Sequence, residues 1–325
     1  MGKPSRVFPA ELLRRSLPVF LLAAVACASA APQHAPERPL FAFQSNFWVN
    51  LHHFARAVAR GMPAPGELSA AERSTWDEGV AFYRDRYMNR DLVFDDGMAA
   101  INNALRVVAG TASLGAAPLD PELKATLERL APIYRAHWWP AHDAANRAWI
   151  AAVEPLLRRH GAALSRRIAA SFDQSWPSEP IPVDLSVTAG PVGAYTTSPP
   201  THTTIAPGPG YGGLASLEML FHEASHAWGK KLDDEIRESA AARHKTVPPQ
   251  LWHAVLFYNA GELTRRTLLE DGVSDYVEYA VRQNVYPNLC GAGCHELVAE
   301  AWNPHLDDRA SIEEALDGLV AAWPE

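Results

Sequence analysis

The chain is poor in cysteine, has no excess of basic residues and contains no apolar run long enough for an ordinary membrane span. Only 3 cysteines occur in 325 residues, and 37 acidic residues outnumber 29 basic ones, for a formal net charge of −8. No basic cluster interrupts this acidic balance. Nucleic acid and anionic lipid are therefore poor candidates for partners. The lack of long apolar runs argues against a stable membrane span.

The N-terminus has the pattern of a secretory signal peptide. Four basic residues precede an apolar run at 17–26, and Ala28-Ser29-Ala30 supplies a small-residue cleavage site. The run is too short to span a bilayer. We therefore expect residues 1–30 to be removed and the protein to be periplasmic or secreted. A lipid attached at Cys27 is the alternative.

Two cysteines then remain, Cys290 and Cys294, separated by Gly-Ala-Gly. In an oxidising compartment this spacing favours a small loop closed by a disulfide. The competing interpretation is a metal clip that also uses His295.

Hydrophobic periodicity predicts an α+β fold that is mainly α. Residues 31–175 form a helical N-terminal region, and prolines near residue 177 mark its end. Residues 176–325 form the predicted catalytic region, in which a small sheet precedes a central helix. The Thr-rich strand at 201–205 is our candidate for a sheet edge that could pair with extended substrate, and an ordinary covered strand is the alternative. Helices are expected near 47–58, 69–87, 95–110, 121–138, 140–173, 248–269, 272–283 and 311–323.

The sequence His222-Glu223-Ala224-Ser225-His226 is the most informative motif. Residues four apart lie on one face of a helix, so both imidazoles can reach a single metal. Glu223 follows the first histidine directly and could accept a proton from metal-bound water. This H-E-x-x-H arrangement predicts a zinc hydrolase.

The surrounding sequence supports that interpretation. Apolar residues from Leu214 to Ala224 recur at helical spacing, and Gly229 is a plausible end of the helix. The motif would then lie on a largely buried helix, where unpaired imidazoles and a carboxylate are costly. A bound metal would remove this cost. Two buried histidines satisfied by hydrogen bonds are the alternative.

The motif and a downstream acidic residue resemble the gluzincin group of zincin metallopeptidases. By this resemblance His222 and His226 bind Zn²⁺, Glu223 is the general base, and a Glu on a second helix completes the site. Glu262, within an apolar helical segment, is our choice for that ligand. Asp271 is its rival, because Glu270-Asp271-Gly272 is similar to the Asn-Glu-Gly pattern of some gluzincins.

The chain also departs from the better-known gluzincin patterns. Arg266 stands where the thermolysin-like group has an Asp that orients a histidine, so Glu218 is considered as a substitute. An Asp ligand at position 233 or 234 would make a different zincin. Tyr258 is the preferred hydrogen-bond donor for a developing oxyanion. Further candidates are Tyr276, Tyr279 and His202, whereas the adjacent His52 and His53 are interpreted as packing or cleft-lining residues.

Together these patterns predict a zinc-dependent hydrolase that acts on peptide or protein substrates. A non-catalytic envelope protein that keeps zinc for structure or partner binding is the alternative. The sequence determines neither the substrate preference nor the oligomeric state.

Overall fold

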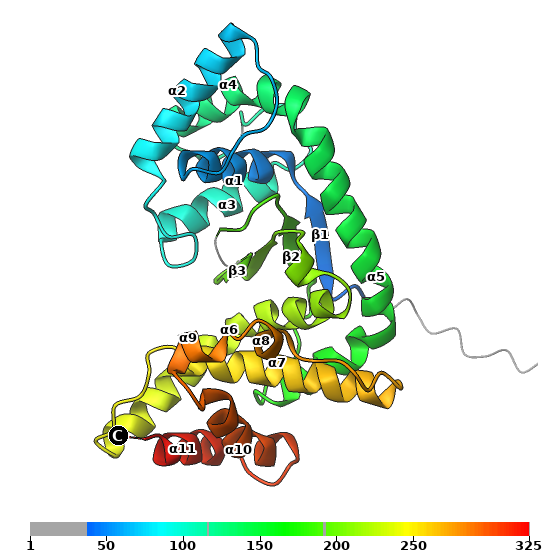
Figure 1. The fold of residues 1–325 in the computed structure, drawn as a ribbon, viewed down its shortest axis with the longest axis vertical. Coiled ribbons are helices and arrows are strands. Elements are labelled where there is room, and N and C mark those ends of the chain that lie inside the picture. The colour runs from blue at the N-terminus through cyan, green and yellow to red at the C-terminus, as the bar shows by residue number, and fades with distance from the viewer. Residues whose placement is uncertain (1–37, 116, 191–192, 325) are drawn as a thin grey trace, which may run out of the picture. The chain divides into compact units, whose positions relative to one another are not determined.

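The computed structural model describes residues 38–115, 117–190 and 193–324, and the chain from Pro39 onward forms one compact unit (Figure 1). The predicted signal peptide, residues 1–30, lies outside the described residues, as does Cys27. The fold is α+β and mainly α, as the sequence predicts. Within the described ranges, no helix is both long enough and apolar enough to cross a membrane.

The first half of the chain is helical after one short strand. Side-chain caps define several helix starts: Asn46, Asp95 and Asp120 accept hydrogen bonds from backbone amides of the first turn, and Ser69 forms a capping box with Glu72. The elements are β1 (Phe41–Ser45), α1 (Phe47–Ala59), α2 (Ala70–Arg86), α3 (Asp96–Val107), α4 (Pro121–His137) and α5 (Trp139–Ala170).

The second half contains the remaining strands and a stack of helices. Its elements are β2 (Ile181–Leu185), β3 (Ala194–Thr197), β4 (His202–Ile205), a 3-10 turn at Pro209–Tyr211, α6 (Leu214–Ala242), α7 (Leu251–Glu270), α8 (Tyr279–Arg282), α9 (Tyr286–Cys290), α10 (Cys294–Leu306) and α11 (Ile312–Ala322). The sulfur atoms of Cys290 and Cys294 lie at disulfide distance, which favours the disulfide over the metal clip.

The four described strands form one mixed sheet in the order β1-β2-β4-β3. β1, β2 and β4 are parallel, and β3 is antiparallel to β4, with Thr196 opposite Thr203. The expectation that strand 201–205 is the edge is wrong: it is β4, and strands cover it on both sides. The edge strand that contacts α6 is β3.

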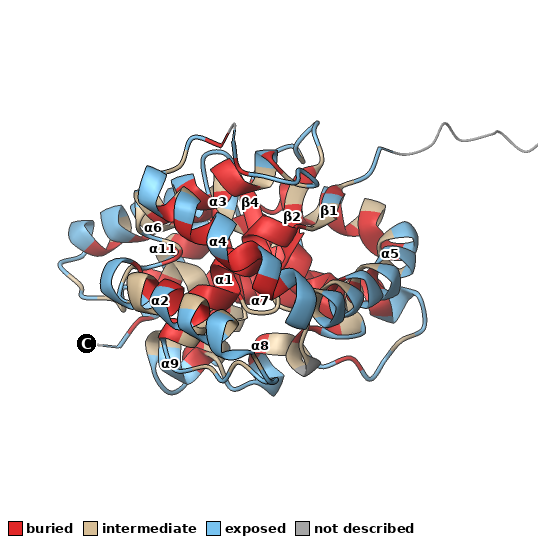
Figure 2. Ribbon diagram, turned by 90° about the horizontal axis from the view of Figure 1, so that it is seen from above, coloured by how far each residue is buried: buried red, intermediate tan, exposed pale blue. Residues whose placement is uncertain are grey.

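Two hydrophobic cores lie on opposite faces of this sheet. Ala194 packs with α5, α6, α7, α10 and α11, whereas the next residue, Tyr195, packs with α1–α4. This follows from the alternation of side chains along a strand. Figure 2 shows buried residues concentrated on α1, α7 and the strands, with exposed residues on the outer side of α5. Because β1 pairs with β2, the sheet joins the predicted regions 31–175 and 176–325, and a boundary near residue 175 stays a prediction.

Two helix predictions are wrong. α6 does not end at Gly229 but continues to Ala242. A Cβ at Gly229 would come within 2.7 Å of the Trp252 ring, so this glycine permits the close approach of α6 and α7. The helix expected over 272–283 is reduced to the single turn of α8, and α10 and β1 were not anticipated.

Candidate metal centre

Three histidines from two packed helices converge on one point. His222 and His226 lie one turn apart on α6, and His253 approaches them from α7. The Nε2 atom of His222 is 3.3 Å from Nε2 of His226 and 3.3 Å from Nε2 of His253. All three ligand atoms lie within 4.8 Å of one another. The sequence identified the first two residues, and the structure adds the third.

Two of the distances between these nitrogens suit a tetrahedral metal. Zn–N bonds of about 2.0–2.1 Å at tetrahedral angles place neighbouring ligand nitrogens about 3.3–3.4 Å apart. The distances from His222 Nε2 to Nε2 of His226 and to Nε2 of His253 are both 3.3 Å. Three histidines would occupy three coordination positions and leave the fourth for water or substrate. These two distances and the donor set therefore fit Zn²⁺.

The protonation of the cluster also suits metal binding. Burial lowers the pKa of His222 well below its usual value, and the neighbouring His226 and His253 add to this effect. Burial likewise lowers the pKa of His226 to about 3 and that of His253 to about 4. All three rings are therefore neutral near pH 7, when a ring nitrogen can offer its lone pair to a cation.

Aromatic rings stack on two of the three histidines. The ring of Phe257 stacks on that of His222 with centroids 3.8 Å apart, and Trp252 stacks on His253 at 5.0 Å. Phe257 lies one turn beyond His253 on α7, so a single helix face supplies both a ligand and its neighbour. Packing on this face restricts the ring orientations before any metal binds.

Glu223 is directed toward the sheet edge. Its side chain is buried, and its Oε2 accepts a hydrogen bond of 2.8 Å from the Thr196 hydroxyl on β3. Thr203 of β4 is 2.8 Å from the same hydroxyl. Burial raises the pKa of Glu223 to about 8, and the bond from Thr196 opposes that rise. A carboxyl group with this pKa holds its proton at neutral pH when no metal is bound.

The structure does not place Glu262 with the histidines, which corrects the choice of third ligand. Its two oxygens are bound by Arg265 and Arg266 at 2.6–2.7 Å, and it is absent from the cluster of ligand atoms. Glu262 follows His253 by nine residues, which is half a turn out of phase on an α-helix. Two residues on opposite faces of α7 cannot serve one centre, and His253 faces α6.

Tyr258 and the rival acids also have other partners. The Tyr258 hydroxyl donates to Asn303 on α10 at 3.0 Å, so it does not face the histidines as an oxyanion donor would. Oδ2 of Asp271 lies 2.8 Å from Nδ1 of His160, and Asp233 and Asp234 pair with basic residues on the surface of α6. None of these three aspartates belongs to the described cluster of ligand atoms.

The remaining sequence candidates are distributed differently. His202 is buried against Asp184, with 2.7 Å between Nε2 and Oδ2. Glu218 accepts hydrogen bonds from the Tyr276 hydroxyl and from the Tyr279 backbone amide, so it anchors the start of α8. Burial raises its pKa to about 7. Its hydrogen bonds give no support to a role in orienting His222.

Tyr279 does lie beside the centre, together with a residue that the sequence analysis missed. Its ring is 6.3 Å from Phe257 and stacks on Tyr211 at 5.3 Å, and its hydroxyl is 3.3 Å from that of Tyr211. The pKa of Tyr211 is raised chiefly by burial, with a contribution from Glu223, which indicates that the two side chains are near each other. Tyr211 lies in the Gly/Pro-rich loop before α6, where no periodic pattern marks it as functional.

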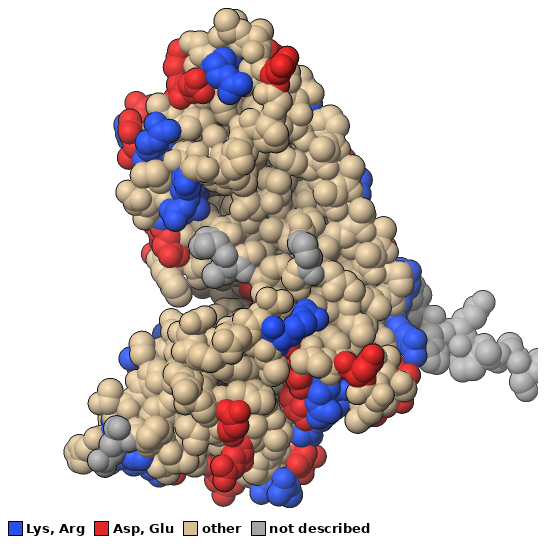
Figure 3. Space-filling model, viewed as in Figure 1, with Lys and Arg blue, Asp and Glu red and all other residues tan. Residues whose placement is uncertain are grey.

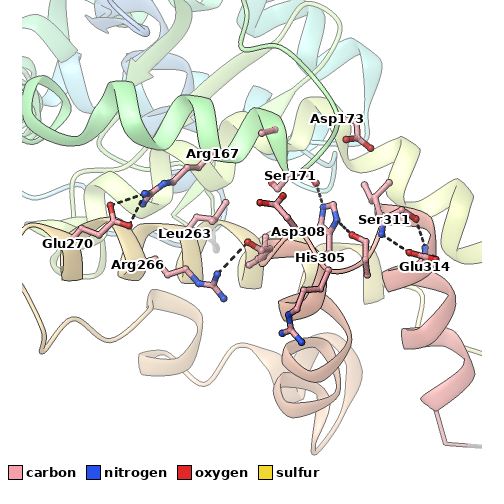
Figure 4. Close-up of a pocket in the computed structure, with 15 residues that line it drawn as sticks. Arg167, Ser171, Asp173, Leu263, Arg266, Glu270, His305, Asp308, Ser311 and Glu314 are labelled. Atoms are coloured by element: carbon pink, nitrogen blue, oxygen red, sulfur yellow. Dashed lines mark hydrogen bonds and ion pairs between the residues drawn. The ribbon is translucent and has the colours of Figure 1, made fainter.

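The cluster is separate from the larger of two described cavities. That cavity, of about 750 Å³, lies between α5, α7 and the α10–α11 segment and is lined by none of the three histidines. Most charged groups that line it are paired within the chain, for example Arg167 with Glu270 (Figure 4). On the face shown in Figure 3, the surface is hollowed between the α1–α4 region and the α6–α11 region.

Comparison with known proteins found no relative of this chain. No family model, no curated protein and no solved structure matches the chain. Any statement about activity therefore depends on the residues themselves.

Proposed function

We propose that the protein is a zinc-dependent hydrolase, most simply a peptidase, whose metal ligands are His222, His226 and His253. The observation that carries this proposal is the convergence of three neutral histidines, in which Nε2 of His222 lies 3.3 Å from Nε2 of both His226 and His253, next to Glu223 in the sequence. Zinc at such a site polarises a carbonyl group and lowers the pKa of bound water. This ligand set differs from that of the gluzincins, because a histidine takes the place of the second-helix glutamate.

The residues around the cluster would have different roles in hydrolysis. Glu223 would receive the proton of the attacking water and deliver it to the leaving amine. A bound cation would favour the carboxylate form of Glu223, which can accept that proton. Burial raises the pKa of Tyr211, and the hydroxyls of Tyr211 and Tyr279 could donate hydrogen bonds to negative charge on the substrate.

The compartment and substrate class are part of the same proposal. The signal-peptide pattern supports a periplasmic or secreted protein, and the edge strand β3 beside α6 offers a backbone to which an extended peptide could pair. A peptide or protein is thus the proposed substrate. The acidic net charge of −8 gives no support to a nucleic-acid substrate.

The alternative is an envelope protein that binds zinc without catalysing hydrolysis. The observation in its favour is burial: His222 is 1% exposed and Glu223 is 3% exposed. In that case the metal would stabilise the packing of α6 against α7, and the protein would show no turnover.

Substitution of the general base tests the two proposals against each other. Glu223→Gln keeps the size of the side chain but removes the proton acceptor, so we expect it to retain zinc and lose chelator-sensitive hydrolysis of a peptide library. Glu238→Gln, at an exposed position of the same helix, is the matched control and should keep both. Hydrolysis that persists in Glu223→Gln would exclude the proposed base. Zinc binding without hydrolysis in the wild type would favour the non-catalytic protein.

A further inference from the structure

A second, smaller cavity lies at the C-terminal end of α1. Its volume is about 210 Å³, and it is lined by His53 and Arg56 of α1, by Arg60 at the C-cap of this helix, and by Thr188 and Gly190 after β2. The chain as a whole is acidic, yet the charged residues that line this cavity are two arginines and no acid. The charge of the cavity is therefore opposite to that of the protein.

Arg56 is buried without an acidic partner. The residue is 6% exposed; its Nε donates to the Tyr87 carbonyl at 3.2 Å, and its Nη2 donates to the Arg90 carbonyl. Within the described part of the chain, Nη1 of Arg56 makes no hydrogen bond. Neither Arg56 nor Arg60 forms an ion pair with a described residue. Burial lowers the pKa of Arg56, and the charge of Arg60 lowers it further.

The carbonyl contacts do not balance this charge. A carbonyl is a neutral acceptor, and a buried ion costs free energy unless an opposite charge faces it. Asp91 acts on Arg56 only at longer range, because it is not within ion-pair distance. One explanation is that both arginines have a structural role and hold the segment after α2 against the end of α1, because Arg60 also donates to the Met88 carbonyl. That account leaves two cations beside a cavity without a counter-charge.

The third polar group of the cavity is a neutral histidine. Burial lowers the pKa of His53 to about 3. The Tyr195 hydroxyl, which accepts from Asn102, is 3.1 Å from His53 Nε2 and can donate to it. A neutral imidazole adds no negative charge to the cavity.

The cavity is distinct from the proposed metal centre. Tyr195, which contacts His53, and Thr196, which contacts Glu223, are consecutive residues of β3 and point to opposite faces of the sheet. The cavity is on the α1 side and the metal centre is on the α6 side. A ligand in the cavity would therefore not touch the histidine cluster.

We propose that this cavity binds a small oxyanion, either a carboxylate or a phosphate, through Arg56 and Arg60. Guanidinium groups recognise both anions through paired N–H donors. The volume of about 210 Å³ corresponds to roughly seven waters at ~30 Å³ each, and it is below the ~300–1,000 Å³ of pockets for larger organic ligands. The ligand is thus a free small anion or the anionic end of a longer molecule.

Calorimetric titration with inorganic phosphate and, separately, with acetate at constant ionic strength tests the proposal. We expect saturable binding of one anion per chain for at least one probe, and the two titrations distinguish phosphate from carboxylate. Arg60 is exposed, so Arg60→Gln should fold and should weaken binding at least tenfold, as expected when a charge-assisted hydrogen bond of about 1.5–3 kcal/mol is lost. Ala57→Met narrows the cavity without a change of charge and should also weaken binding.

Two controls separate the cavity from other anion sites. Arg84→Gln removes the same charge from an exposed position on α2 and should leave the affinity unchanged. His253→Ala should also leave it unchanged, because anions held by a metal would depend on that ligand. The proposal is overturned if neither probe shows saturable binding, or if Arg60→Gln and Arg84→Gln have equal effects. It is also overturned if binding is lost in His253→Ala but retained in Arg60→Gln.

Discussion

Replacement of Glu223 should change how the stability of the metal-free protein depends on pH. Glu223 is buried with a single described hydrogen-bond donor, Thr196, and its pKa is raised from the usual 4.5 to about 8. Between these values the folded protein holds a proton that the unfolded chain has lost. Stability contributed by this group is therefore complete below pH 4.5 and is lost as the pH rises toward 8. Glu223→Gln cannot titrate, so it lacks this loss.

The size of the effect follows from the shift in pKa. One pKa unit corresponds to about 1.4 kcal/mol, so the whole shift amounts to about 5 kcal/mol. Between pH 5 and pH 7.5, the free energy of unfolding of the wild type should fall by about 3 kcal/mol relative to that of Glu223→Gln. The histidines and Glu218 titrate in both proteins, so their contributions cancel in this difference.

Urea unfolding followed by tryptophan fluorescence, with chelator present, measures this difference. Glu238→Gln is the control and should run parallel to the wild type. Bound zinc favours the carboxylate form and should shrink the difference. Parallel pH profiles for the wild type and Glu223→Gln without metal would refute the reasoning, because they would mean that Glu223 is ionised in the folded protein at no cost.

Three further substitutions probe the surroundings of the centre. Glu218→Gln should flatten the pH dependence of urea unfolding between pH 4.5 and 7 by about 3 kcal/mol, because burial raises the pKa of Glu218 to about 7; an unchanged profile would contradict its burial as a carboxylic acid. Gly229→Ala should weaken zinc binding about tenfold in a chelator competition, because its Cβ would meet the Trp252 ring and separate α6 from α7; unaltered affinity would show that the contact adjusts freely. Thr196→Val removes the hydrogen bond that lowers the pKa of Glu223, so the stability loss assigned to Glu223 should extend to higher pH, and a shift to lower pH would contradict the assignment.

Local patterns in the sequence were sufficient for most helices and for part of the site. The predicted helix near 47–58 corresponds to α1, and that near 121–138 corresponds to α4, because apolar periodicity and capping residues are local signals. His222 and His226 could be paired because four residues make about one helical turn. Glu223 was found for the same reason, as part of one contiguous motif.

The third ligand could not be found from local patterns because it depends on how two helices pack. His253 and Glu262 both lie on α7, and only the face that α7 turns toward α6 decides between them. That face is set by contacts such as the one between Gly229 and Trp252. In the sequence, however, Gly229 resembles the end of a helix. The resemblance to gluzincins favoured an acidic ligand, and the structure instead pairs Glu262 with two arginines.

The edge of the sheet was misplaced for a related reason. The sequence shows two short Thr-rich strands in succession, but it does not show which of them pairs with β2. Because β4 pairs with β2 through Val183 and Thr203, β3 becomes the outer strand. β1 was missed because it lies far from its partner in the chain, before a long helical region. Strand order is non-local information, whereas helix caps and periodicity are local.

Zinc affinity measured by competition with a chromogenic chelator, for His253→Ala beside Glu262→Gln, tests the central claim most directly. Binding at structural zinc sites amounts to about 10–16 kcal/mol, so one of three protein ligands should account for about 3–5 kcal/mol. We predict that the wild type binds one zinc per chain, that His253→Ala weakens binding at least about 100-fold, and that Glu262→Gln leaves it unchanged. A loss of zinc in Glu262→Gln with full binding in His253→Ala would contradict the three-histidine centre.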